Sequence, residues 1–184
     1  MRKPTCQYLD KPPTFEEFNK IIKSAKSHKT GRDILSVEIL KYAPSKMLKL
    51  SVYQIILRIW EDLQIPDSFL EHILCSIYKK GDKSLCENQR GISLMSHVCK
   101  IFSLLLEKHL EKYFESIGIF PESQCAFRRN RSTVDMMFTA RLLQQACLEK
   151  QITLFLAFLD ITKAHDSVGR QTLWKILEAL GLPH

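Results

Sequence analysis

The sequence ITLFLAFLD, residues 152–160, carries the strongest indication of the fold class. Its apolar run from Ile152 to Leu159 is typical of a central strand that is buried on both faces. The strand would end on Asp160, and a carboxylate at the mouth of a rigid strand is well placed to hold a divalent metal ion. The alternative interpretation is that Asp160 only makes a strand-terminal turn.

A second acidic residue, Asp166, follows in the stretch ITKAHDSV. Mg²⁺ is bound by hard oxygen ligands, usually one or two carboxylates together with substrate phosphates. Asp166 is nevertheless favoured as the N-cap of a following helix, because a short carboxylate side chain accepts hydrogen bonds from the first free backbone amides.

Outward from this run, helical patterns dominate the chain. Apolar side chains recur at helical spacing in five segments: residues 14–27, 46–64, 96–115, 132–150 and 170–180. Residues 28–46 are predicted to form a loop with a short helical turn, and residues 72–78 a short β-strand. Few strands among many helices predict an α+β domain that is predominantly helical.

Composition and charge restrict the class of protein. The 184 residues are 45% hydrophobic and 26% charged, which is typical of a globular domain with a real core. The net charge of +7 is compatible with a polyanionic partner but is also common in ordinary proteins.

No pair of cysteines has zinc-ligand spacing. Without a secretory signal or a long apolar run, we expect an intracellular protein of the nucleus or cytoplasm, with no membrane partner.

Two basic segments are candidates for binding phosphate. The first runs from IYKKGDKS at residues 77–84 to NQRGISL at residues 88–94, and its lysines and arginine suit a triphosphate. The alternative is a solvated charged hairpin. The second, PESQCAFRRNRST at residues 121–133, places three arginines just before a predicted helix start, where helix amides also favour phosphate. The alternative there is a basic loop with an ordinary N-cap.

Taken together and in this order, these segments resemble the reverse transcriptase domain of LINE-type (non-LTR, jockey-like) retrotransposons. That family typically shows yKKGDKs…NyRGISLLs, then lPESQcGFRpgRST, then FiDltKAFDtV. The chain reads KKGDKSLCENQRGISLMS, FPESQCAFRRNRSTVD and FLDITKAHDSVGR, and its GRDILSVEILK resembles the family's pGpDgIpaEllK. The resemblance covers about residues 12–184.

The resemblance implies a right-hand polymerase, of which this chain would carry the fingers and the first palm strand. Residues 1–70 would be a helical N-terminal extension, residues 71–150 a fingers-like region, and residues 151–184 the start of the palm. RNA template and DNA primer are the implied partners. The implied reaction is attack of a primer 3′-hydroxyl on an α-phosphate, assisted by two Mg²⁺ ions.

The resemblance also implies roles for individual residues. Asp160 would be the catalytic, metal-binding carboxylate, with the Ile161 carbonyl beside it. The incoming nucleotide would be contacted by Lys79, Arg90, Ile161 and His165. The template strand would lie along Gln124, Phe127, Arg128 and Arg131.

The chain departs from the family pattern at several of these motifs. His165 stands where the family has an aromatic residue that resembles the polymerase steric gate, so selection against a ribose 2′-hydroxyl is expected to differ. Gln89 replaces a Tyr, and Ala126 replaces a Gly. The family's aromatic-Ala-Asp-Asp motif is missing, because no Asp-Asp pair occurs in the sequence. We therefore expect the chain to be inactive alone. The alternative is a non-catalytic nucleic-acid-binding remnant or a domesticated interaction module.

Overall fold

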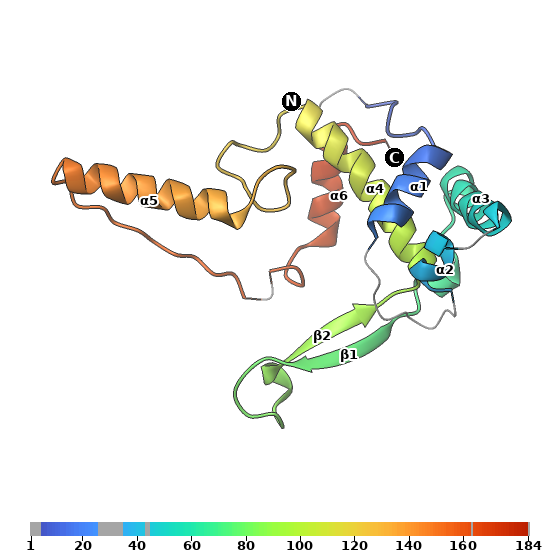
Figure 1. Ribbon diagram of the computed structural model, residues 1–184, viewed down its shortest axis with the longest axis horizontal. Helices are drawn as coiled ribbons and strands as arrows, with labels where there is room; N and C mark the ends of the chain where they lie inside the picture. Colours follow the sequence, from blue (N-terminus) through green and yellow to red (C-terminus); the bar gives the residue numbers. More distant parts are fainter. Residues whose placement is uncertain (1–4, 26–34, 43–44, 163, 184) are drawn as a thin grey trace. The chain divides into compact units, whose positions relative to one another are not determined.

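The computed structural model describes residues 5–25, 35–42, 45–162 and 164–183 (Figure 1). The chain divides into two compact units, one of residues 10–110 and the other of residues 1–9 with 111–184. Six α-helices lie in the described segments: α1 (Phe15–Ser24), α2 (Val37–Tyr42), α3 (Lys46–Asp62), α4 (His97–Ser116), α5 (Thr133–Glu149) and α6 (Arg170–Ala179). With one small sheet they make a mixed α+β protein, as the sequence predicted.

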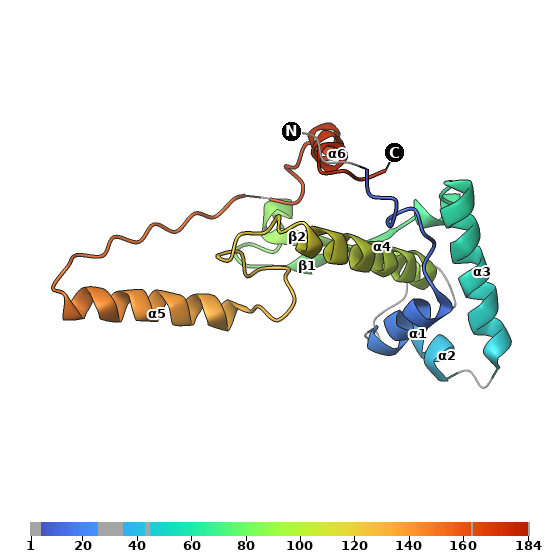
Figure 2. The same ribbon diagram turned by 90° about the horizontal axis from the view of Figure 1, so that it is seen from above.

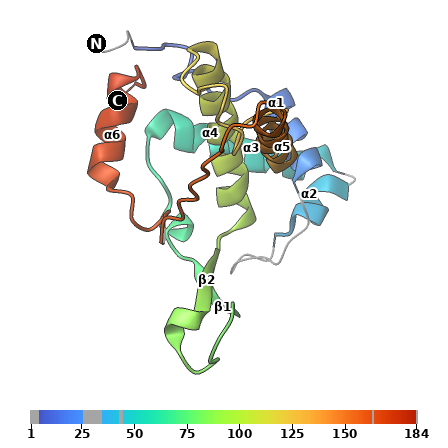
Figure 3. The same ribbon diagram turned by 90° about the vertical axis from the view of Figure 1, so that its left-hand side faces the viewer.

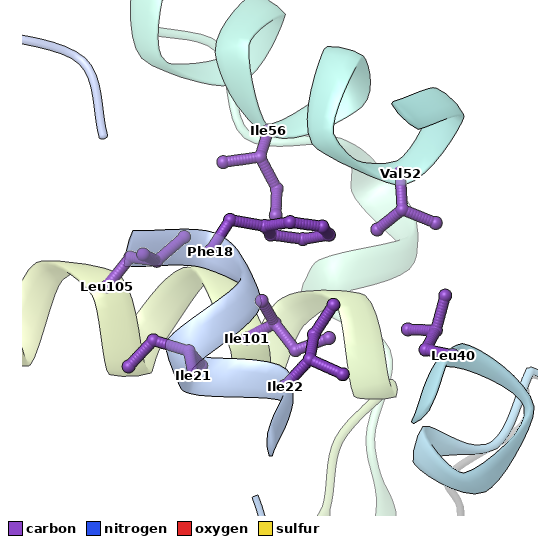
Figure 4. Close-up of a cluster of buried hydrophobic side chains, with 8 residues drawn as sticks. All are labelled: Phe18, Ile21, Ile22, Leu40, Val52, Ile56, Ile101 and Leu105. Atoms are coloured by element: carbon purple, nitrogen blue, oxygen red, sulfur yellow. The ribbon is translucent and has the colours of Figure 1, made fainter. Parts of the chain in front are cut away.

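The core of the unit of residues 10–110 is formed by apolar side chains from four helices. α1 begins at the N-cap Thr14, whose side chain accepts from the amide of Glu17 while the Glu17 carboxylate accepts from the Thr14 amide, a complete capping box. The buried cluster shown in Figure 4 consists of Phe18, Ile21, Ile22, Leu40, Val52, Ile56, Ile101 and Leu105. Its members recur at helical spacing within α1, α3 and α4, and this periodicity is why these helices were predictable.

A β-hairpin completes this unit. β1 (Ile73–Tyr78) and β2 (Gln89–Leu94) pair antiparallel, from Ile73 opposite Leu94 to Tyr78 opposite Gln89. Figure 3 shows β2 leading into α4. β1 is the strand predicted from residues 72–78. Its partner was foreseen only in the alternative of a charged hairpin, because Gly91 and Arg90 weaken the strand pattern of β2.

In the unit of residues 1–9 and 111–184, α5 has a capping box at its start. The Ser132 side chain accepts from the Asp135 amide, and the Asp135 carboxylate accepts from the Ser132 amide. α5 buries none of its residues. Tyr113 hydroxyl donates to the Leu180 carbonyl at 2.6 Å, which ties the last turns of α4 to the end of α6.

The predicted buried strand at residues 152–159 is wrong. This segment is extended but forms no strand, and Phe155 and Phe158 are 89% and 93% exposed. It runs back along α5 (Figure 2) and shares with it a groove of about 620 Å³. The physical reason is that a buried strand needs neighbours on both edges and faces, and within the described residues the only two strands pair with each other.

Within the described residues, no helix combines the length and the apolar character needed to cross a membrane.

Candidate functional site

The tip of the β1–β2 hairpin is a turn that its own side chains hold in place. Gly81 has φ +87°, and a Cβ there would meet the Asn88 side-chain nitrogen at 2.8 Å, so the turn requires glycine. The Tyr78 hydroxyl donates to the Gly81 carbonyl at 2.7 Å. Asn88 Nδ2 donates to the Asp82 carbonyl at 2.9 Å. The tip therefore has a defined backbone conformation, although its residues are exposed.

Two polar side chains add further ties across this turn. The Asp82 carboxylate accepts from the Ser84 amide at 2.9 Å and from the Ser84 hydroxyl at 2.7 Å, and these hydrogen bonds lower the pKa of Asp82. Gln89, which replaces the family's Tyr, contacts the Ser76 hydroxyl and donates to the Lys83 carbonyl at 2.9 Å. Gln89 therefore contributes two side-chain contacts to the hairpin.

The hairpin places Lys79 and Arg90 on one face. Arg90 lies opposite Ile77 in the ladder, and the Lys79 amide donates to the Asn88 carbonyl at 2.9 Å, which extends the pairing. Side chains alternate between faces with a period of two, so Lys79 shares the face of Ile77 and Arg90. Both cations are exposed, and no carboxylate from the described residues is paired with either. The two predicted triphosphate ligands are therefore neighbours.

The second basic segment forms the loop between α4 and α5, and its arginines meet glutamates. Arg128 makes a two-pronged contact with Glu115, with Nε–Oε1 and Nη2–Oε2 distances of 3.0 Å each. The hydrogen bond and charge of Arg128 lower the pKa of Glu115. Arg129 Nε lies 3.4 Å from Glu111 Oε1, and Arg131 Nη2 contacts Glu122 Oε2. The positive charge of this loop is thus largely balanced within the chain.

Phe127 in the same loop is presented to solvent. It is 91% exposed and has φ +59°, a left-handed conformation that is uncommon for a bulky residue. Its ring lies edge-on to His165, with centroids 6.5 Å apart. Gln124 Nε2 donates to the Ala126 carbonyl at 3.2 Å. The structure therefore brings together a predicted template residue, Phe127, and a predicted nucleotide residue, His165.

The predicted metal-binding residues do not form a metal site in this conformation. Asp160 and Ile161 are exposed on the extended segment, and the described residues contain no group of three or more His, Cys, Asp or Glu side chains that would hold an ion. The described carboxylates therefore do not fit a pair of Mg²⁺ ions. Asp166 is not a helix N-cap either, since the N-cap of α6 is Gly169, three residues later. The N-cap prediction failed because an intervening turn separates Asp166 from the helix.

Sequence reasoning missed the partners of these residues. Glu115 lies 13 positions before Arg128 and belongs to a different element, so no local spacing links them. Asn88 was quoted only as part of a motif and Gln89 only as a departure from the family's Tyr, although their side chains hold the turn. The only sequence feature that could have indicated these ion pairs is that several glutamates precede the cluster of arginines.

Two comparisons with known proteins identify the family of this chain. Residues 77–184, which contain the hairpin tip, β2, the arginine loop and Asp160, match the family described as reverse transcriptase (RNA-dependent DNA polymerase). The Xenopus laevis protein "Transposon TX1 uncharacterized 149 kDa protein" is 26% identical over 172 residues, which is 93% of this chain. The chain spans 13% of that relative's length. The chain belongs to the reverse transcriptase (RNA-dependent DNA polymerase) family.

Proposed function

We propose that this chain supplies the nucleotide- and template-facing part of an RNA-directed DNA polymerase and does not synthesise DNA on its own. The observation that carries the proposal is the register of the hairpin, which gives Lys79 and Arg90 a shared face beside the turn. A point-charge ammonium beside a planar guanidinium fork suits the oxygens of a triphosphate. Lys80 and Lys83, both exposed on the same tip, raise the local positive potential.

The template strand is proposed to run past Gln124, Phe127 and Arg131. Phe127 supports this proposal because an exposed aromatic ring offers a stacking surface to any base. Arg131, with 36% of its side chain exposed, has room to exchange Glu122 for a phosphate. His165, beside Phe127, is proposed to contact the nucleotide sugar, as its position in the motif implies.

The extended segment of residues 152–159 is proposed to become the first palm strand when further strands of a complete polymerase pair with it. This proposal is supported by the exposure of apolar side chains along the segment, which a neighbouring strand or layer would cover. In the family the metal chemistry is supplied by Mg²⁺ at clustered carboxylates. Asp160 is proposed as one of those carboxylates. Because the described residues contain no group of three or more ligating side chains, this chain is proposed to contribute binding and orientation only.

Two measurements on the 184-residue chain test this function. In a primer-extension assay with an RNA template, a DNA primer, Mg²⁺ and deoxynucleotides, we expect no product, and robust synthesis would contradict the proposed inactivity. In equilibrium dialysis with labelled dTTP, we expect the variant Lys79→Gln/Arg90→Gln to bind about tenfold more weakly than the original chain. Lys20→Gln, which removes an exposed cation from α1, is the matched control and should bind as the original does.

A non-catalytic nucleic-acid-binding remnant is the second candidate. The observation in its favour is that the cations of the hairpin tip are exposed. They could bind phosphates of a nucleic acid whether or not Asp160 holds a metal ion. Salt-dependent binding of single-stranded RNA together with no measurable binding of dTTP would favour the remnant over the polymerase part.

A further inference from the structure

We infer that Arg128 is a positioning residue that acts through Glu115: together they fix the loop of residues 120–131 so that Phe127 is held outward for a template base to stack on it. This inference rests on the proposed function as far as the template is concerned. The fixed loop itself does not depend on that function.

The guanidinium of Arg128 has little surface left for a phosphate. Its Nε and Nη2 donate to the two carboxylate oxygens of Glu115, and Nη1 donates to the Pro121 carbonyl at 3.0 Å. The side chain is only 10% exposed, whereas those of Arg129 and Arg131 are 66% and 36% exposed. Each of the three arginines contacts a glutamate, but in Arg128 all three guanidinium nitrogens donate to groups of the described residues.

The contacts of Arg128 join the loop to α4 directly through Glu115 and indirectly through Phe120. Glu115 lies in the last turn of α4, and Phe120 lies under the guanidinium with its ring centroid 5.7 Å from the Arg128 Cζ atom. The Phe120 ring packs edge-on against Phe114 of α4, with centroids 6.0 Å apart. An ion pair and an aromatic contact thus hold opposite ends of the same loop against one helix.

Phe127 depends on this support because of its backbone. A left-handed conformation at a bulky residue persists only where the surroundings fix it, and Phe127 adjoins Arg128 directly. Its own side chain is 91% exposed and contributes almost no burial that would hold the loop. We therefore expect loss of the Arg128–Glu115 pair to release Phe127, even when every positive charge of the loop is retained.

Measurements of RNA binding distinguish a positioning role of Arg128 from direct contact between Arg128 and phosphate. For a fluorescein-labelled oligouridine in anisotropy titrations, we expect Phe127→Ala, Arg128→Gln and Glu115→Gln each to weaken binding by about tenfold. The double variant Arg128→Gln/Glu115→Gln should be no weaker than either single variant, since both remove one contact. Arg128→Lys should also weaken binding, because a lysine keeps the charge but not the fork.

Direct contact between Arg128 and phosphate predicts the opposite for Glu115. Glu115→Gln would then strengthen RNA binding or leave it unchanged, since it removes a negative charge and frees the arginine. Arg128→Gln would reduce the slope of log affinity against log salt by about 0.7. Either result would overturn the positioning role.

Digestion with trypsin tests the fixed loop without nucleic acid. Glu115→Gln keeps all loop arginines, and we expect it to accelerate cleavage after Arg129 and Arg131 by several-fold. Glu107→Gln, at an exposed position of the same helix, is the matched control and should cleave as the original chain does. Unchanged cleavage in Glu115→Gln would contradict the inference that the Arg128–Glu115 pair fixes the loop. If Glu115→Gln is cleaved faster but the original chain binds no RNA, the fixed loop stands. The proposed template path and the stacking role of Phe127 would then both be wrong.

Discussion

Thr14 and Glu17 illustrate how a local pattern becomes structure at the scale of single residues. A hydroxyl at the N-cap and a carboxylate three positions later satisfy each other's backbone amides, and both hydrogen bonds are present. Such pairs were predictable because they lie within one turn. The Arg128–Glu115 pair was not, because it depends on how a loop returns to a helix.

The Glu17 carboxylate makes the stability of the chain depend on pH. Burial alone would raise the pKa of Glu17, but hydrogen bonds from the Thr14 amide and hydroxyl outweigh burial, and His109 adds to them, so the pKa lies below its ordinary value. A lowered pKa in the folded state stabilises the protein above the unfolded value and loses that contribution as the pH falls through the folded value. We therefore expect the free energy of unfolding to decline as the pH falls below the unfolded-state pKa of Glu, about 4.3.

Glu17→Gln should remove part of this decline and cost about 0.5–1 kcal/mol at neutral pH, as loss of a cap does. Urea unfolding at several pH values, followed by circular dichroism, measures both effects. Glu107→Gln serves as the control at an exposed position. Identical pH profiles for Glu17→Gln and the original chain would show that the cap carboxylate does not contribute.

At the scale of elements, helices were predicted well and strands poorly. α1, α3, α4, α5 and α6 follow predicted segments because helical periodicity is a property of the segment itself. The segment of residues 152–159 has the composition of a central strand, but a strand forms only where another strand offers hydrogen bonds. The sequence therefore indicated the tendency of this segment without indicating its state in the isolated chain.

The exposure of that segment leads to a prediction. Phe155→Ser/Phe158→Ser should leave the free energy of unfolding within about 0.5 kcal/mol of the original, because side chains 89% and 93% exposed lose almost no burial. The same change should reduce self-association, since it removes an apolar patch from solvent. Urea unfolding and analytical ultracentrifugation measure the two effects. A large loss of stability would mean that the segment is buried in solution.

At the scale of the whole molecule, the buried cluster lies entirely in the unit of residues 10–110. The α+β class was predictable from the balance of elements. The division near residue 110 falls within α4, where an uninterrupted helical pattern gives no sign of a boundary. The proposed division into an N-terminal extension, fingers and palm stays a prediction.

Neighbouring isoleucines of α3 test where stability resides. Ile56 is fully buried and Ile55 is 45% exposed, so Ile56→Ala should cost about 2–5 kcal/mol and Ile55→Ala well under 1 kcal/mol. Fluorescence of Trp60 reports on this unit, because its ring lies against Phe102. Trp174→Phe removes the other tryptophan of the chain and gives a single-probe background. Equal losses for the two isoleucine variants would contradict the assigned core.

The pairing of the loop arginines with glutamates has a kinetic consequence. Among the described residues, the loop gives little net field at a distance, because each arginine is offset by a nearby carboxylate. The unpaired cations of the hairpin tip should then steer a polyanion toward the chain and govern the association rate, which falls with ionic strength. The loop would act after the encounter and govern how slowly the complex dissociates. Of the two basic segments of this sequence, only the hairpin tip would therefore attract a polyanion from a distance.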